Sequence, residues 1–234
     1  MHLTVTSVQY RPHGIAAVIV TSDPSEAAGG GDVAPTEVEA VEAAPTLLLA
    51  DTAALHRLAR GRTLTPAEWD AVREEGRTGL AVRHAMSLVA RKPRSEAEVR
   101  RALGAHEAAF DTAEVAAAMA RLRELGAVDD SRWAERYVAQ PRAAGRGAGL
   151  LRRELTQRGV AASEVAAALD GRDEGAEALA AALKRVRSLR GLDRETARRR
   201  LYDFLRRRGF ADADARRAME SALAEIGAEA SAEA

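Results

Sequence analysis

Clusters of arginine are the residues of this chain best suited to chemistry with a partner molecule. They lie between residues 131 and 208, a stretch with 19 basic and 10 acidic side chains. A guanidinium group donates hydrogen bonds in a planar fork and stays charged at physiological pH, so such clusters suit phosphates or carboxylates. We expect eight arginines to form a contact surface: Arg146, Arg152, Arg153, Arg158, Arg198, Arg199, Arg206 and Arg207.

The alternative interpretation of these arginines is a set of solvated helix faces. Glu195 and Arg199 are four residues apart, as are Asp203 and Arg207. Opposite charges at this spacing stabilise a helix by a few tenths of a kcal/mol each. The chain as a whole has a formal net charge of zero, so the basic stretch stands between acidic ends. Both interpretations stay open from composition alone.

A second candidate is the segment 106–110, His-Glu-Ala-Ala-Phe, which begins like the zinc-protease motif His-Glu-x-x-His. Its fifth residue is Phe110, so the second metal ligand is missing. The other histidines show no ligand spacing, and the absence of cysteine excludes a disulfide scaffold or a cysteine nucleophile. No Gly-x-Ser-x-Gly elbow and no paired carboxylates stand out. We therefore expect no enzyme, no metal and no cofactor.

A third candidate is the glycine-rich segment 145–149, Gly-Arg-Gly-Ala-Gly. A phosphate-binding loop needs Lys-Ser/Thr after its last glycine and a strand before it. Here Leu150 and Leu151 follow, and a helix is expected before. This pattern argues against a nucleotide site. It predicts a flexible, basic helix entry whose free N–H groups can meet a phosphate.

The elements that must position these residues follow from a repeat of 50 residues. Phe110, Val160 and Phe210 are 50 residues apart, and each follows the end of one helix and precedes the next. Leucine or valine pairs four residues apart mark the buried face of the middle helix of each unit. These pairs are Val99 with Leu103, Leu151 with Leu155, and Leu201 with Leu205. One supersecondary unit used three times predicts an extended helical surface.

The predicted fold is mainly α: tandem three-helix, helix-turn-helix-like repeats in an elongated curved array, with a small N-terminal β-hairpin region. Strands are expected at 3–8, 15–20 and 46–50. The expected boundaries are 1–50 for the β-rich region with a flexible insertion at 22–45, 51–76 for connecting helices, 77–126, 127–171 and 172–226 for the three repeats, and 227–234 for a frayed tail.

Capping residues predict where the helices begin. Asp51 is expected to cap a helix at 52–60, and Thr65 with Glu68 forms a capping signature around Pro66. A separate helix is expected at 80–91. The repeat helices are expected at 95–104, 112–125, 130–140, 149–158, 162–169, 175–189, 194–208 and 212–226, with Ser95, Asp111 and Asp193 among their caps.

Four segments, in order, resemble the RecX family of bacterial regulatory proteins. Residues 92–100 (KPRSEAEVR) are similar to the family's Arg-Pro-x-Ser-x-x-Glu-Leu-Arg, and residues 126–134 (GAVDDSRWA) to its Gly-aromatic-apolar-Asp-Asp segment. Residues 147–160 carry its Gly, Glu-Leu and basic-Gly-apolar positions, and 204–210 (FLRRRGF) its closing signature. The resemblance covers about residues 91–219.

The resemblance implies a negative modulator of the recombinase RecA, and hence a regulator of homologous recombination, DNA repair and the SOS response. Family members are tandem three-helix repeats that bind the groove of the RecA–DNA filament and inhibit its ATPase, strand-exchange and coprotease activities. From the sequence itself we expect a monomer, and we expect a cytoplasmic protein because the first 20 residues lack the basic segment and continuous apolar core of a signal peptide. No stretch of the sequence approaches the 18 apolar residues of a membrane span.

The alternative function is a sequence-independent DNA-binding regulator of helix-turn-helix type. Residues 150–170 have the pattern of such a motif, with Gly159 in the turn. The second helix, 162–169, carries no Arg, Lys, Asn or Gln to read bases. Single- or double-stranded DNA remains a possible partner through its phosphates alone.

Overall fold

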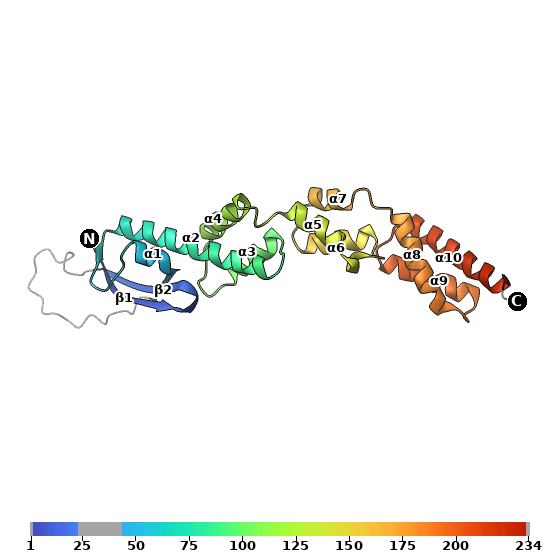
Figure 1. Ribbon diagram of the computed structural model, residues 1–234, viewed down its shortest axis with the longest axis horizontal. Coiled ribbons are helices and arrows are strands. Elements are labelled where there is room, and N and C mark those ends of the chain that lie inside the picture. Colours follow the sequence, from blue (N-terminus) through green and yellow to red (C-terminus); the bar gives the residue numbers. More distant parts are fainter. Residues whose placement is uncertain (1, 23–43, 233–234) are drawn as a thin grey trace, which may run out of the picture. The chain divides into compact units, whose positions relative to one another are not determined.

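The computed structural model describes residues 2–22 and 44–232 (Figure 1). The chain divides into two compact units, Met1–Pro93 with Val99–Ala127, and Arg94–Glu98 with Val128–Ala234. The mainly helical class, with three-helix repeats and a small N-terminal β region, is confirmed. Nearly all of the insertion expected at 22–45 lies outside the described residues.

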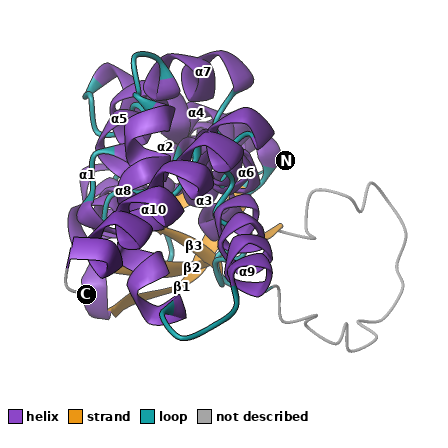
Figure 2. Cartoon of the chain, turned by 90° about the vertical axis from the view of Figure 1, so that its right-hand side faces the viewer, coloured by secondary structure: helices purple, strands orange, loops and turns teal. Residues whose placement is uncertain are grey.

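The β region is a four-stranded antiparallel sheet in the order β3-β2-β1-β4. β1 (Leu3–Arg11) and β2 (Ile15–Ser22) form the predicted hairpin around a 3-10 turn at Pro12–Gly14, and β3 (Thr46–Leu49) pairs with β2. Figure 2 shows β1, β2 and β3 as neighbouring strands. β4 (Thr63–Leu64) was not predicted, because two residues are too few to show an alternating pattern.

The helix predicted at 52–60 is wrong at both ends. α1 runs over Ala50–Leu55, and its N-cap is Leu49, which makes no side-chain cap. Asp51 lies inside the first turn instead, where its carboxylate interacts favourably with the positive end of the helix dipole. Arg57, with a φ of 50°, then turns the chain out of the helical region.

The long helix α2 (Pro66–Arg91) replaces two predicted helices. The capping box of Thr65 and Glu68 is confirmed at its start, where the Glu68 N–H donates to Thr65 Oγ1 at 3.2 Å and the Thr65 N–H to Glu68 Oε2 at 2.7 Å. The helix continues through residues 76 and 77, so the boundary expected there lies in the middle of an element.

Two glycines inside α2 are packing positions rather than helix breaks. A Cβ added to Gly76 would lie 3.0 Å from the Cβ of Leu48 in β3, and one added to Gly79 would lie 3.0 Å from Cδ2 of Leu49. The glycines therefore let the helix approach the sheet closely, a gain that offsets their low helix propensity. Packing against the sheet thus continues the helix through the boundary that was expected between residues 76 and 77.

The three repeats share one arrangement, in which the first and third helices pack together: α2 with α4, α5 with α7, and α8 with α10. The remaining helices are α3 (Glu96–Gly104), α4 (Thr112–Glu124), α5 (Asp130–Val138), α6 (Ala148–Gln157), α7 (Ala162–Leu169), α8 (Glu174–Val186), α9 (Arg194–Arg207) and α10 (Asp212–Ala232). α10 is longer than predicted and includes most of the tail that was expected to fray. No helix among the described residues is both long and apolar enough to cross a membrane.

The 50-residue period marks the core of each repeat. Phe110, Val160 and Phe210 are all buried, with exposed fractions of 7%, 4% and 1%. The six middle-helix positions are fully buried: Val99, Leu103, Leu151, Leu155, Leu201 and Leu205. The predicted caps at Ser95, Asp111 and Asp193 are confirmed, since each side chain accepts the backbone N–H three residues on.

The period also fixes a backbone conformation in the turn before the third helix. Ala109, Gly159 and Gly209 are 50 residues apart and have φ angles of 47°, 83° and 88°. Glycine adopts this left-handed conformation without steric cost, whereas alanine does not. The first repeat therefore holds an alanine where the fold prefers a glycine.

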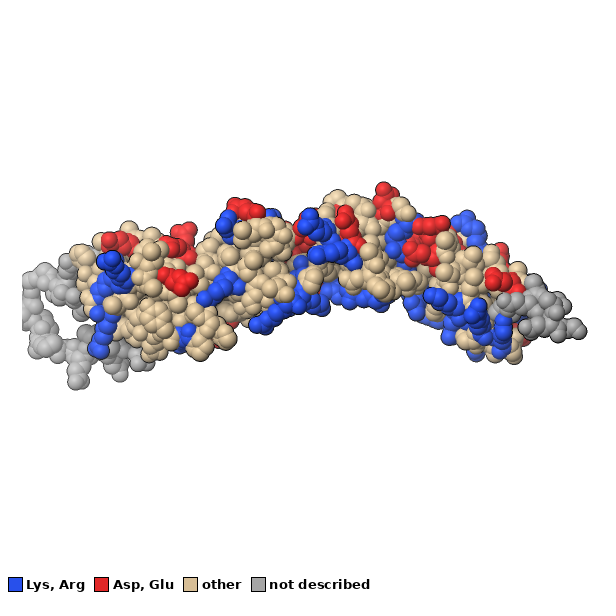
Figure 3. Space-filling view, in the orientation of Figure 1, with Lys and Arg blue, Asp and Glu red and all other residues tan. Residues whose placement is uncertain are grey.

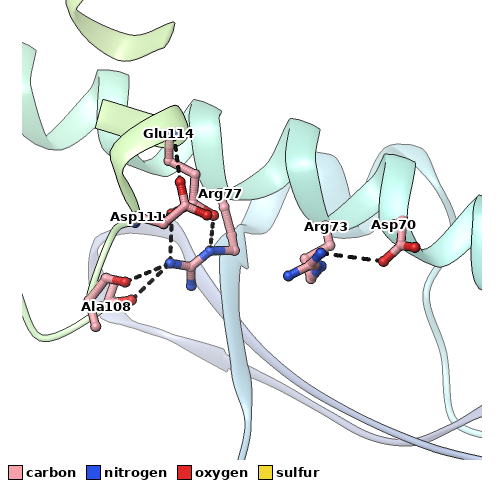
Figure 4. A network of polar contacts seen from close by, with 7 residues as sticks. Asp70, Arg73, Arg77, Ala108, Asp111 and Glu114 are labelled. Atoms are coloured by element: carbon pink, nitrogen blue, oxygen red, sulfur yellow. Dashed lines mark hydrogen bonds and ion pairs between the residues drawn. The ribbon is translucent and has the colours of Figure 1, made fainter. Parts of the chain in front are cut away.

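Arg77 on α2 secures this strained turn in the first repeat (Figure 4). Its guanidinium donates to the carbonyl oxygens of Ala108 and Ala109 at 3.1 and 3.0 Å, and it forms a bidentate ion pair with Glu114. Both charged side chains are nearly buried, and the hydrogen bonds that Arg77 donates to the Glu114 carboxylate raise the pKa of Arg77. Glu114 also accepts the Asp111 N–H at 2.9 Å, so one carboxylate joins the helix cap to the turn.

We expect Ala109→Gly to stabilise the chain by about 1 kcal/mol, because glycine removes the cost of the left-handed conformation. Urea unfolding of the full chain, followed by circular dichroism, measures the change. Ala105→Gly just after α3, where φ is not positive, is the control and should not stabilise. An Ala109→Gly variant with lowered stability would contradict the strain at this turn.

Candidate functional site

The start of α6 and the end of α9 meet backbone to backbone in the second unit. The Gly147 N–H donates to the Arg208 carbonyl at 2.8 Å, and the Gly149 N–H to the Gly209 carbonyl at 3.1 Å. A Cβ on Gly147 would lie 2.4 Å from the Phe210 nitrogen. A side chain does not fit at this distance from the opposing backbone, so glycine is required for the second repeat to contact the third here. We call this contact the glycine crossing.

The glycine crossing corrects the prediction that the segment 145–149 offers free N–H groups to a phosphate. Gly147 and Gly149 donate to the third repeat, and the Ala148 N–H donates to both carboxylate oxygens of Glu174 at 3.0 and 2.9 Å. A protein carboxylate thus occupies the position that an external anion would take at the start of a helix. The segment is a junction between repeats.

Three of the predicted arginines surround a hollow at the glycine crossing. Arg152 and Arg153 come from α6 and Arg206 from α9, and with Gly149, Gly209 and their neighbours they line a volume of about 330 Å³. Figure 3 shows Lys and Arg atoms gathered along the edge of this unit that α6 and α9 form. We call this set of three the junction arginines.

The junction arginines differ in the number of hydrogen bonds that they make within the protein. Arg206 donates to the Phe210 carbonyl at 2.7 Å, which leaves its remaining N–H groups for a partner. Arg152 and Arg153 are exposed, and neither makes an ion pair or hydrogen bond among the described residues. These two side chains therefore offer complete guanidinium forks to an incoming anion.

The other arginines predicted on α9 lie farther along the helix. Arg198 and Arg199 line a second hollow of about 230 Å³ with Tyr202 and Arg216. Arg198 approaches Glu220 at 3.7 Å, a loose and exposed pair that contributes little stability. Arg207 is exposed and lines neither hollow. The structure thus separates the predicted α9 surface into two groups.

Arg158 serves the fold of the second repeat. Its Nη1 lies 2.5 Å from Glu98 Oε1, and its carbonyl accepts the Ser95 hydroxyl at 2.6 Å. Its guanidinium also stands over the rings of Trp133 and Tyr137, at 5.7 and 5.4 Å from their centroids. A charged side chain held from three sides is a structural cation rather than a free one.

Arg146 is likewise held inside the repeat. Its Nη1 donates to both carboxylate oxygens of Glu154, at 2.7 and 2.9 Å, and the Tyr137 hydroxyl donates to the same carboxylate at 2.9 Å. This network fixes the glycine-rich segment against α5 and α6. The side chain of Arg146 is only 28% exposed.

Sequence reasoning missed the partners that hold these arginines. Glu98 is 60 residues from Arg158 and Glu154 is eight residues from Arg146, and neither spacing is a helical i,i+4 pair. It also missed Gly147 and Gly209 as contact residues. A glycine that precedes a helix and another that ends one are compatible with close backbone approach, but only the fold shows that the two meet.

These features define a helical-repeat protein that presents arginines at a junction between two repeats. Comparison with known proteins identifies the family to which these repeats belong. The family models for the second and third three-helix domains of RecX match residues 129–169 and 173–219. The regulatory protein RecX of Thermobifida fusca is 38% identical over 151 residues, which cover 62% of this chain and 79% of that protein. The RecX of Streptomyces coelicolor is 33% identical, over 61% and 77% of the two chains.

Two solved structures have a similar fold. A crystal structure of regulatory protein RecX matches with a TM-score of 0.59 over 91% of this chain and 96% of its own, at 17% identity. RecX from Lactobacillus salivarius matches with a TM-score of 0.56 over 62% and 96%, at 15% identity. The chain belongs to the RecX family of regulatory proteins.

We expect Gly209→Ala to lower the free energy of unfolding by about 2–4 kcal/mol, because its Cβ meets backbone and its φ is left-handed. The added Cβ would lie 2.3 Å from the Leu150 nitrogen. Gly171→Ala is the matched control: its φ is 71°, but nothing lies within 4 Å, so we expect a loss of about 1 kcal/mol. Urea unfolding of both full-length variants makes the comparison. Equal losses would contradict a close crossing.

We expect Arg158→Ala to lower the free energy of unfolding by about 1–3 kcal/mol, because it leaves the half-buried Glu98 without its ion pair. Arg153→Ala removes the same charge from the exposed face of α6 and should change stability by no more than about 0.5 kcal/mol. Thermal unfolding of the two variants at equal ionic strength provides the measurement. The assignment of Arg158 to the fold fails if the two variants melt together.

Proposed function

We propose that this protein is a negative modulator of RecA that binds the RecA–DNA filament. In this proposal it inhibits ATP hydrolysis, strand exchange and coprotease activity, and it works as a binding protein without catalysis of its own. Membership of the RecX family and the resemblance of its motifs support the partner. The physical support is the set of junction arginines, which come from two repeats and surround one hollow.

The junction arginines suit an acidic partner surface for three reasons. The helices that carry them are joined by a rigid backbone contact, so the helices need not rearrange when the arginines bind. Arg152 and Arg153 are exposed and have no anion among the described residues. A filament presents both phosphates and carboxylates, and a guanidinium fork binds either group with two parallel hydrogen bonds.

In this proposal the eight predicted arginines have different roles. Arg152, Arg153 and Arg206 form the centre of the contact surface, and Arg198, Arg199 and Arg207 extend it along α9. Arg146 and Arg158 act indirectly, because their ion pairs with Glu154 and Glu98 hold the segments that carry the surface. Loss of Arg146 or Arg158 therefore lowers the stability of the fold, and it weakens binding only as a consequence of that.

The rival function is sequence-independent DNA binding without RecA. It is favoured by the same unpaired guanidinium groups, which bind a phosphate as well as a carboxylate. The exposed side chains of α7 include Ala162, Ser163, Ala166 and Ala167, and none of these is suited to reading base edges in a groove. This rival therefore predicts binding through phosphates alone.

We expect Arg152→Glu/Arg153→Glu to raise the concentration needed for half inhibition of the DNA-dependent RecA ATPase by roughly tenfold or more, through charge repulsion. The control is Arg132→Glu/Arg136→Glu, which makes the same charge change at exposed positions of α5. The control should inhibit as the parent does.

Two further measurements separate the proposal from its rival. The same titration at two salt concentrations reports how far the contact is electrostatic. Binding of the parent chain to a fluorescent oligonucleotide without RecA tests direct DNA contact. Inhibition that is unchanged by the reversal of Arg152 and Arg153 rejects this surface. Tight DNA binding with no effect on RecA ATPase rejects the proposed function in favour of the rival.

A further inference from the structure

A further cleft lies in the unit that contains the second and third repeats. It shares no lining residue with the hollow of the junction arginines. It has a volume of about 690 Å³, within the range of ligand-binding clefts. One wall is the end of α5 and the turn that follows, residues 138–141 with Ala144 and Gly145. The opposite wall is α8, and α9 contributes Phe204 and Arg208.

The wall formed by α8 is one continuous helix face. Glu177, Ala180, Ala181, Lys184 and Arg185 follow the spacing i, i+3, i+4, i+7 and i+8 and all line the cleft. The small side chains of the two alanines leave the space open. The cleft thus has an apolar middle and a basic end.

The charges of the cleft do not cancel. Its one lining carboxylate among the described residues, Glu177, is paired with Arg172, which also donates to the Arg146 carbonyl at 3.2 Å. Lys184, Arg185 and Arg208 form no ion pair among the described residues. The basic end therefore carries three unpaired positive charges beside an apolar hollow.

Phe204 positions two of these three cations. The guanidinium carbon of Arg208 lies 5.1 Å from its ring centroid and that of Arg185 lies 5.7 Å away. Arg208 Nη1 also donates a long hydrogen bond of 3.4 Å to the Gly145 carbonyl. Stacking on an aromatic ring itself uses none of the N–H groups of a guanidinium, so the remaining N–H groups of both side chains stay available for an anion. Arg185 and Arg208 therefore form a preorganised binding site for carboxylate or phosphate oxygens.

Comparison of Arg208 with the equivalent arginine of the second repeat shows that the lack of a carboxylate partner is specific to the third repeat. Arg208 is 50 residues from Arg158, and each arginine precedes the glycine of its turn. Arg158 has its carboxylate partner in Glu98. Arg208 stands over an aromatic ring in the same way, but no carboxylate of the described residues pairs with it.

The lining favours an acidic peptide over a nucleic acid. Base recognition in single strands needs an aromatic face on which a base can stack, whereas two guanidinium groups already stand over the Phe204 ring. Ala180 and Ala181 offer an apolar wall that fits an aliphatic side chain but contributes nothing to a phosphate backbone.

We propose that this cleft binds an acidic segment of a partner protein, in which an aliphatic side chain enters the apolar middle and flanking carboxylates pair with Lys184, Arg185 and Arg208. The site is separate from the surface proposed for the RecA filament, and it is tested without RecA. A negative result for the cleft would therefore not affect the proposed function, and a negative result for the proposed function would not affect the cleft.

The test is an NMR titration of the ¹⁵N-labelled full-length chain with a short synthetic peptide in which leucine alternates with glutamate. We expect amide shifts at the cleft residues and an affinity roughly tenfold higher than for the same peptide with glutamine in place of glutamate. Replacing leucine by serine in the peptide should also weaken binding. An oligothymidylate of similar length is the competing probe.

Two variants test the site from different sides. Ala180→Trp fills the cleft from an exposed position and should abolish the shifts, as should the charge reversal Lys184→Glu/Arg185→Glu. Arg132→Glu/Arg136→Glu, outside the cleft, should bind the peptide as the parent does. Where Ala180→Trp fails to fold, the charge reversal decides alone.

The remaining outcomes overturn the proposal. An absence of shifts in the cleft with the acidic peptide rejects the site. Equal binding of the glutamine peptide shows that the three cations do not select carboxylates. Displacement of the acidic peptide by the oligothymidylate, with larger shifts of the same amides, identifies a nucleic-acid site instead.

Discussion

The arrangement of the second unit depends on the contact between two stretches of glycine backbone. The Gly147 and Gly149 N–H groups donate to carbonyls at the end of α9, at distances that no Cβ would allow. This contact sets the distance between α6 and α9, and with it the place of every arginine on those helices. Because the contact is made by backbone, it leaves the side chains around it free for other uses. A junction through large side chains would have covered the surface that the arginines now form.

Most of the arginines near this junction fall into two chemical roles. Arg146 and Arg158 have carboxylate partners and lie half-buried in the second repeat, whereas Arg152 and Arg153 are exposed and unpaired among the described residues. The difference follows from where each side chain leaves the backbone. α6 buries Leu151 and Leu155, so the residues beside Leu151 point away from the core. Arg146 and Arg158 flank α6 at its two ends, where Arg146 pairs with Glu154 of α6 itself and Arg158 pairs with Glu98 of α3.

The sequence predicted the core well and the junction poorly, for a physical reason. Burial repeats along the chain, so Phe110, Val160 and Phe210 could be recognised by spacing, and caps such as Ser95 and Asp193 act within three residues. The glycines of 145–149 act on a segment about 60 residues away. Local chemistry therefore suggested a helix entry with free N–H groups, and only the folded chain shows their backbone partners. Gly76 in α2 likewise packs against Leu48 of another element, a contact that no local pattern shows.

The repeats share a core, and they differ in how they use arginine at the turn before the third helix. In the first repeat, Arg77 comes from α2 and holds the carbonyls of the strained Ala109 turn. In the second, Arg158 lies in the turn itself and is held by Glu98 and two aromatic rings. In the third, Arg208 has an aromatic ring but no carboxylate among the described residues. The arginine therefore has a carboxylate partner in the first two turns, whereas in the third it still has N–H groups that can bind an anion from outside. A repeat that keeps its core and changes one ion pair can thus convert a structural position into a binding position without any change of fold.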